Sequence, residues 1–208
     1  MYRLLGRQTS GNVQKILFML EEIEADYTRE DYGRQFENTQ TDAYRAMNPT
    51  SKVPTLLHGD TVIWESNTIL RYLAAQDGDK LTGATAAEKT EVERWMDFLL
   101  AAINAGYLAA FKGSKLPPEE RAPGYDAQVK ELIANMKILD GHLAGREFLA
   151  LGRLTLADIA CAPILARCLA FDTGRPSMPE LERWMAAIAT RPAFLAATGK
   201  GPSRSAAA

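Results

Sequence analysis

The octapeptide QTSGNVQK, residues 8–15, places hydroxyl and carboxamide side chains where an apolar run ends and a helical pattern begins at Val13. Gly11 lets the backbone turn sharply and approach a ligand closely. Two interpretations are open: these polar side chains cap a helix, or one of them donates a hydrogen bond to a reacting group. The candidate donors are Thr9, Ser10 and Asn12.

A second polar group lies in WESN, residues 64–67, where another apolar run meets a helical pattern. Backbone N–H groups at a helix start, together with the Ser66 hydroxyl, suit a carboxylate. Glu65 beside them could accept a hydrogen bond from an ammonium group. Together these groups would bind the amino-acid end of a ligand. The alternative is that Ser66 only caps the helix, which contributes about 1 kcal/mol, and such caps are commoner than ligand sites.

Val53-Pro54 stands at the start of a strand-like run, where proline cannot donate a hydrogen bond to a neighbouring strand. An edge position explains this simply. A cis peptide bond is the other explanation, and only about 5–6% of X-Pro bonds in folded proteins are cis. A cis bond would turn the backbone of Val53 outward, where its N–H and C=O could pair with a peptide-like ligand.

The composition argues against several other functions. The chain has 208 residues and is 47% hydrophobic, which is enough to bury a core. Its formal charge of -2, from 24 basic and 26 acidic residues, argues against a nucleic-acid binder. The longest uncharged apolar stretch, residues 98–111, is shorter than the roughly 20 residues that span a bilayer. With no signal-like N-terminus, we expect a soluble cytoplasmic protein with no membrane contact.

Metal binding and disulfide chemistry are not expected either. Cys161 and Cys168 fall on one predicted helix about 10.5 Å apart, which is too far for a disulfide. No CxxC motif is present, and His58 and His142 are isolated from each other and from the cysteines.

The predicted secondary structure that must position the polar groups changes along the chain. The first 80 residues mix strand and helix patterns, which predicts an α/β unit with a mixed sheet. Its expected elements are a strand at 2–5, a helix at about 12–24, a strand at 27–32, a helical turn near 42–46, a hairpin of 53–57 with 61–64, and a helix capped by Ser66.

The remainder reads as helical, with helices at about 86–111, 123–143, 155–170 and 178–190, and a last short helix around Phe194. Thr155 and Asp158 have the spacing of a capping box, which we assign to folding. We therefore expect four regions: domain 1–78, linker 79–86, all-helical domain 87–198 and flexible tail 199–208.

Four segments together resemble the soluble glutathione transferases. NPTSKVPTL (48–56) is close to that family's NPxGKVPxL, and ESNTILRYL (65–73) is close to its ESxAIxxYL. RWMD (94–97) and LTLADI (154–159) fit its helical half. The resemblance implies a thioredoxin-like α/β domain followed by an all-α helical bundle, usually as a homodimer. Ser51 departs from the family pattern, which has glycine there. Because no tyrosine occupies the first turn and CPxC is absent, the resemblance points to a serine-type, theta- or beta-like bacterial subgroup.

The resemblance also implies roles for the residues above. The proline matching Pro54 is cis in the family, and the residue before it, here Val53, binds the cysteinyl backbone of glutathione. Glu65 and Ser66 would hold the γ-glutamyl end, and Lys52 or a residue near Gln40 would face the glycyl carboxylate. A serine in the first turn donates to the thiol in the family. Ser10 fits best there, with Asn12 either capping the helix or facing the thiol, and Thr9 also open.

The implied reaction is attack by the thiolate of glutathione, the co-substrate, on an electrophilic small molecule, with no metal. Two alternatives stay open: a glutathione-dependent isomerase, dehalogenase or peroxidase, and a non-catalytic binding protein of the same family. The electrophile would lie against the first long helix of the second domain. The expected wall residues are Phe98, Tyr107 and Phe111, for each of which core packing is an equally good explanation.

Overall fold

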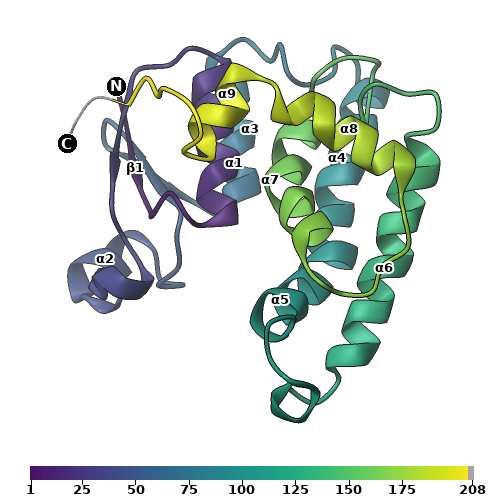
Figure 1. The fold of residues 1–208 in the computed structure, drawn as a ribbon. Coiled ribbons are helices and arrows are strands. Elements are labelled where there is room, and N and C mark those ends of the chain that lie inside the picture. Colours follow the sequence, from purple (N-terminus) through teal and green to yellow (C-terminus); the bar gives the residue numbers. More distant parts are fainter. Residues whose placement is uncertain (206–208) are drawn as a thin grey trace. The chain divides into compact units, whose positions relative to one another are not determined.

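The computed structural model describes residues 1–205, which form two compact units (Figure 1). The first unit contains Met1–Lys80 and the segment that begins at Ala189, and the second contains Leu81–Ile188. This differs from the expected helical domain 87–198, because the last helix belongs to the first unit. The reason is packing: Phe194 of that helix meets Phe18 edge to face, with ring centroids 5.3 Å apart.

The first unit is built on a four-stranded mixed sheet in the order β2-β1-β3-β4. Strands β1 and β2 are parallel, whereas β3 is antiparallel to both β1 and β4. This confirms the thioredoxin-like expectation. The elements are β1 (Tyr2–Leu5), α1 (Gly11–Glu22), β2 (Tyr27–Glu30), α2 (Asp42–Met47), β3 (Thr55–His58), β4 (Thr61–Trp64), α3 (Ser66–Gln76) and α9 (Pro192–Ala197). Two short 3-10 turns, Arg34–Phe36 and Asn38–Gln40, precede α2.

Helix α1 is buried around almost its whole circumference, although its sequence predicts an amphipathic helix. It packs against α3 and also against α9, which comes from the other end of the chain. Ten of its residues, Gly11 and 13–21, are buried. The charged Lys15 of this helix is therefore enclosed by tertiary packing rather than exposed to solvent.

The segment after α9 is fastened to the first unit rather than free, as far as it is described. The carboxylate of Glu21 accepts hydrogen bonds from the Tyr27 hydroxyl (2.6 Å), the Ser203 hydroxyl (2.8 Å) and the Arg204 N–H (2.9 Å). Burial raises the pKa of Tyr27, so its hydroxyl stays protonated and donates. Ser203 and Arg204, in the tail expected to be flexible at 199–208, thus contact the first unit, and the tail's last three residues lie outside the described part.

The second unit consists of helices, as the sequence predicts. The long helix expected at 86–111 is observed with a π-helical segment, Leu99–Ile103, within it. Gly106 and Gly113 on its last part allow close packing, because a Cβ would lie 2.5 Å from Leu132 or 2.7 Å from the Tyr125 ring. The helices are α4 (Ala86–Phe98), α5 (Asn104–Gly113), α6 (Tyr125–His142), α7 (Leu156–Ala170) and α8 (Pro179–Ala189), with a 3-10 turn at Pro118–Glu120 (Figure 1).

Asp158 ties the core of the second unit together. Its side chain is fully buried and accepts hydrogen bonds from the N–H groups of Leu149 (2.9 Å) and Thr155 (3.0 Å), the Thr155 hydroxyl (3.2 Å) and the Trp184 indole N–H (3.0 Å). Burial raises the pKa of this carboxyl, and the four donors oppose that rise. The capping box predicted at Thr155 and Asp158 is confirmed, and it joins α7 to a loop and to α8.

Within residues 1–205, no helix is long and apolar enough to cross a membrane. The same residues contain no group of three or more His, Cys, Asp or Glu side chains placed to hold a metal ion. Cys161 and Cys168 are both buried free thiols, and burial raises the pKa of Cys168 to about 12, so that thiol is unreactive.

Candidate active site

The turn between β1 and α1 positions the first polar group. Helix α1 begins at Gly11, so Ser10 occupies the N-cap position and Asn12 lies in the first helical turn. The helix starts one residue before the expected position of about 12, and of the two roles left open for Asn12 the capping role falls to Ser10 instead. Ser10 is about 9% exposed, and its hydroxyl makes no capping hydrogen bond. That hydroxyl is not committed to the helix, whereas Thr9 and Asn12 are exposed on either side of it.

A small cavity in the first unit gathers most of the predicted ligand residues. Asn12 reaches it from α1, Lys52, Val53 and Pro54 reach it from the loop before β3, and Glu65 and Ser66 reach it from the start of α3. Two further residues, Asn48 and Thr50, complete its wall. The cavity therefore offers an amide, an ammonium and a carboxylate within one concave surface. Segments from three parts of the sequence meet there.

The peptide bond between Val53 and Pro54 is cis, as the resemblance implies and in contrast to the commoner geometry of such bonds. Strand β3 begins only at Thr55, so Val53 lies before the paired part of the strand. Val53 is half-buried at the cavity, with its backbone next to Lys52.

Asn48 holds the loop that carries these residues. Its Nδ2 donates to the carbonyl oxygen of Lys52 (2.9 Å) and to the Thr55 hydroxyl (3.0 Å). Its Oδ1 accepts from the N–H (3.1 Å) and the hydroxyl (2.7 Å) of Thr50. The Tyr44 hydroxyl adds a 2.7 Å hydrogen bond to the same Lys52 carbonyl. The sequence indicated Asn48 only as the first residue of the NPTSKVPTL motif. Its buried side chain is a positioning group for this wall of the cavity.

The backbone conformation at Ser51 explains why the family pattern has glycine at this position. Its φ of 54° places it in the left-handed region, which costs an L-residue roughly 1–2 kcal/mol. Glycine avoids this cost but loses more conformational entropy on folding, about 0.5–1 kcal/mol.

We expect the Ser51→Gly variant to be more stable than the parent by about 0.5–1 kcal/mol, because relief of the left-handed backbone outweighs glycine's larger loss of conformational entropy. Urea denaturation measures the difference. The matched control is the reverse change, Gly59→Ser, at a turn where φ is 57° and a side chain would have open space. That variant should lose a similar amount, and an unchanged or lower stability of Ser51→Gly would contradict the account.

Glu65 and Ser66 together begin α3, with one correction to the expected roles. Glu65, not Ser66, is the N-cap residue, with φ 69° and ψ 117°, and Ser66 is the first helical residue. A non-glycine residue at positive φ has a strained backbone, and such residues cluster at functional sites. The first N–H groups of α3 have no partner within the helix, so they can bind an anion. The Glu65 side chain is exposed at the same point and can accept from an ammonium.

Gln40 lies apart from this cavity. Its side-chain oxygen accepts a 2.8 Å hydrogen bond from Arg45, and it does not belong to the cavity wall. Of the two residues proposed for a glycyl carboxylate, Lys52 is the one at the cavity.

The aromatic residues proposed for an electrophile wall fall into two places in the second unit. Tyr107 and Phe111 lie with ring centroids 6.2 Å apart, and both rings meet Phe171, at 6.1 Å and 6.4 Å. Phe98 instead meets Trp95 edge to face at 5.7 Å. Phe171 was missed from the sequence because it lies 60 residues beyond Phe111, just after α7, and no local pattern links the two.

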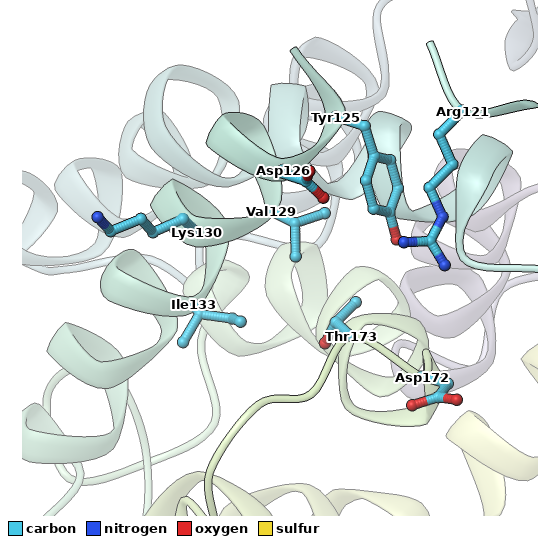
Figure 2. A pocket seen from close by; sticks show the side chains of 8 residues that line it. All are labelled: Arg121, Tyr125, Asp126, Val129, Lys130, Ile133, Asp172 and Thr173. Carbon is cyan, nitrogen blue, oxygen red and sulfur yellow. The ribbon is translucent and has the colours of Figure 1, made fainter. Parts of the chain in front are cut away.

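A separate cavity of about 280 Å³ lies beside the N-terminal half of α6 (Figure 2). Figure 2 shows the Arg121 side chain beside the Tyr125 ring, with the guanidinium carbon 4.7 Å from the ring centroid. Asp172 and Thr173, which directly follow Phe171, close the other side. Both acidic and basic side chains line this cavity, and none of the predicted ligand residues lines it.

Two family models match the chain. One, described as the N-terminal domain of glutathione S-transferase, matches residues 2–75, and the other, described as the C-terminal domain, matches residues 99–192. Together they cover most of both units.

Individual proteins and structures agree with these matches. Glutathione S-transferase GstB of Escherichia coli (strain K12) is 36% identical over 198 residues, which are 93% of this chain and 95% of that protein. A glutathione-bound crystal structure of the theta class glutathione S-transferase from Xanthomonas axonopodis pv. citri has a TM-score of 0.87 at 34% identity, covering 93% of this chain and 95% of that one. A glutathione transferase family member from Pseudomonas fluorescens pf-5, with two glutathione molecules bound, has a TM-score of 0.86 at 27% identity, covering 95% and 92%.

Proposed function

The chain belongs to the glutathione S-transferase family, and from this premise we propose which of its residues bind glutathione and which activate the thiol. The enzyme is a glutathione transferase, which uses the thiolate of glutathione to attack an electrophilic small molecule. Neither the isomerase, dehalogenase or peroxidase alternative nor a non-catalytic role is favoured by the matches. The observation that carries our assignment is the single cavity that joins the cis-proline loop, the start of α3 and the first turn of α1.

The cavity has the groups that the two ends of glutathione require. At the γ-glutamyl end, the first N–H groups of α3 would bind the carboxylate, and the exposed Glu65 would accept from the ammonium group. At the glycyl end, the Lys52 ammonium would pair with the second carboxylate. Val53 lines the same cavity and would hold the peptide in the middle. Gln40 stays a weaker candidate because it lies outside the cavity wall.

For the thiol, we propose two hydrogen-bond donors at the start of α1. A free thiol has a pKa near 8.5, so only a few per cent is ionised at pH 7. Lowering that pKa by about two units requires roughly 2.7 kcal/mol of preferential interaction with the thiolate. Ser10 does not line the cavity itself but lies two residues before Asn12, which does. Its uncommitted hydroxyl would be the main donor, Asn12 would be the second, and the positive end of the α1 dipole would add to both. On this proposal the enzyme is a serine-type, theta- or beta-like member.

For the electrophile, we propose the aromatic group Tyr107, Phe111 and Phe171, which replaces the expected set that included Phe98. Three rings within 6.4 Å of one another offer an apolar surface that suits an apolar electrophile. Turnover of a panel of electrophiles tests this assignment.

We also propose a homodimer. Each unit exposes large apolar side chains, including Val62 and Trp64 on β4, Leu108 on α5 and Ile138 on α6. A second copy of the chain would cover such surfaces. Light scattering after size exclusion measures the mass directly against the 22.9 kDa of one chain. A cytoplasmic location remains a prediction.

We expect the wild type to be retained on immobilised glutathione, to elute with free glutathione and to conjugate at least one electrophile of a panel. Glu65→Ala should weaken glutathione binding about tenfold, because the ligand's ammonium loses its acidic partner. The matched control, Glu119→Ala, removes an exposed carboxylate from the other unit and should bind as wild type. Failure of the wild type to bind glutathione would refute the assignment, and binding without any turnover would support a carrier.

A further inference from the structure

Lys15 is one of the largest fully buried side chains of the protein, at 1% relative exposure. Lysine is rarely buried, because removing an ammonium from water is costly unless it forms polar contacts. Neighbouring positions of α1 carry apolar core residues such as Val13 and Ile16, so an apolar residue would pack here without that cost. A lysine at this position therefore calls for a role that its charge or its hydrogen bonds supply.

The Lys15 ammonium contacts one wall residue of the cavity that we propose for glutathione. Its Nζ donates to Ser66 Oγ, across 3.4 Å from α1 to α3. Ser66 Oγ in turn donates to Asn12 Oδ1, at 3.5 Å. Ser66 and Asn12 both line the cavity, whereas Lys15 does not. The three side chains form a line from the core to the ligand surface.

The ammonium favours one direction for these hydrogen bonds, because Ser66 cannot donate its proton to Lys15. An ammonium can only donate hydrogen bonds, whereas a hydroxyl both donates and accepts. Since Ser66 Oγ accepts from Lys15, its own proton is available for Asn12. In the structure Asn12 receives that proton on its carbonyl oxygen, which leaves the two N–H groups of its amide for the cavity. With a neutral residue at position 15, Ser66 could accept from Asn12 instead, and the amide would be free to turn its acceptor outward.

We propose that Lys15 is a positioning residue for glutathione, whose buried ammonium directs the hydrogen bonds from Lys15 through Ser66 to Asn12 so that Asn12 presents N–H donors to the ligand's sulfur. This inference rests on the proposed function, since it concerns the same cavity. It assigns Asn12 the part of second donor beside Ser10. It also gives the buried lysine a reason that core packing does not supply.

The test compares Lys15→Met, which keeps the volume and removes the charge, with Lys15→Arg, which keeps a donor-only cation. At saturating glutathione, the pH profile of kcat/KM for one electrophile reports the pKa of the bound thiol. Lys15→Met should raise that pKa by about one unit, which corresponds to about a tenfold loss at neutral pH. Lys15→Arg should restore most of the loss. The charged side chains that line the cavity, Lys52 and Glu65, are unaltered in both variants.

Two controls separate positioning from folding. Lys137→Met removes an exposed lysine from α6 and should leave the pH profile unchanged. Binding of S-methylglutathione, which has no ionisable thiol, should weaken less than threefold in Lys15→Met. An unchanged pH profile, or a loss that appears only as lower melting temperature, overturns the proposal.

If Lys15→Met does not fold, Lys15→Gln replaces it, because its neutral amide can still reach Ser66 but no longer imposes one direction. A pH profile like that of wild type in Lys15→Gln overturns the proposal, and a smaller upward shift supports it. Failure of the proposed function itself looks different: the wild type then shows neither glutathione binding nor conjugation before any variant is compared.

Discussion

Replacing Ser10 with alanine is expected to lower kcat/KM for conjugation about 100-fold at neutral pH, with a much smaller change in KM for glutathione. The Ser10 hydroxyl stands at the N-cap of α1 without a capping hydrogen bond, so it is available to the sulfur. Loss of one preorganised donor to a developing or resting anion typically costs a factor of 10²–10³. Steady-state kinetics over pH should show the thiol pKa raised by up to about two units. Folding should not suffer, since the cap contact is absent from the parent.

The neighbouring residues decide whether Ser10 is the right one. Asn12→Ala should cost about tenfold, in line with a second donor, and Thr9→Ala should cost least of the three. Ser177→Ala, an exposed serine in the other unit, controls for the chemical change itself and should match wild type. A larger loss in Thr9→Ala or Asn12→Ala than in Ser10→Ala would show that the main donor is misassigned.

Asp158→Ala is expected to lower the free energy of unfolding of the protein by about 3–5 kcal/mol. The change leaves four buried donors without their acceptor, and a buried group that loses its partner costs about 1–3 kcal/mol. The same carboxylate also joins the start of α7 to Leu149 and to Trp184 of α8, so its removal affects three segments at once. Urea denaturation followed by circular dichroism measures the loss.

A second capping box provides the matched control. Thr85 and Glu88 form the same motif at the start of α4, but on an exposed surface. Glu88→Ala should therefore cost no more than about 1 kcal/mol, because water replaces the lost contacts. Equal losses in the two variants would show that the motif, and not the burial of Asp158, accounts for its contribution to stability.

Much of the fold could be predicted from local patterns. The strand at Tyr2–Leu5 was predicted at its observed bounds, and the hairpin and helical half followed from turn residues and apolar periodicity. Helix starts were wrong by one residue at Asn12 and at Ser66, because several polar residues in a row can each serve as the cap. The cis state of Pro54 could be favoured only through the family resemblance, since the intrinsic preference of such bonds is trans.

Local patterns were enough to predict which chemical groups the site offers. These are an acid and a hydroxyl at one helix start, hydroxyl and amide donors at another, and a lysine shortly before the proline. Local patterns suffice here because motifs and caps depend on residues near one another in the chain. Only the tertiary structure placed Asn48 under the loop, paired Phe171 with Tyr107 and Phe111, and enclosed Lys15 between α1, α3 and the cavity wall. The contacts of Lys15 with Ser66 and of Tyr107 with Phe171 join residues at least 51 positions apart in the sequence. They form only when the chain buries these side chains, and no local sequence pattern predicts that burial.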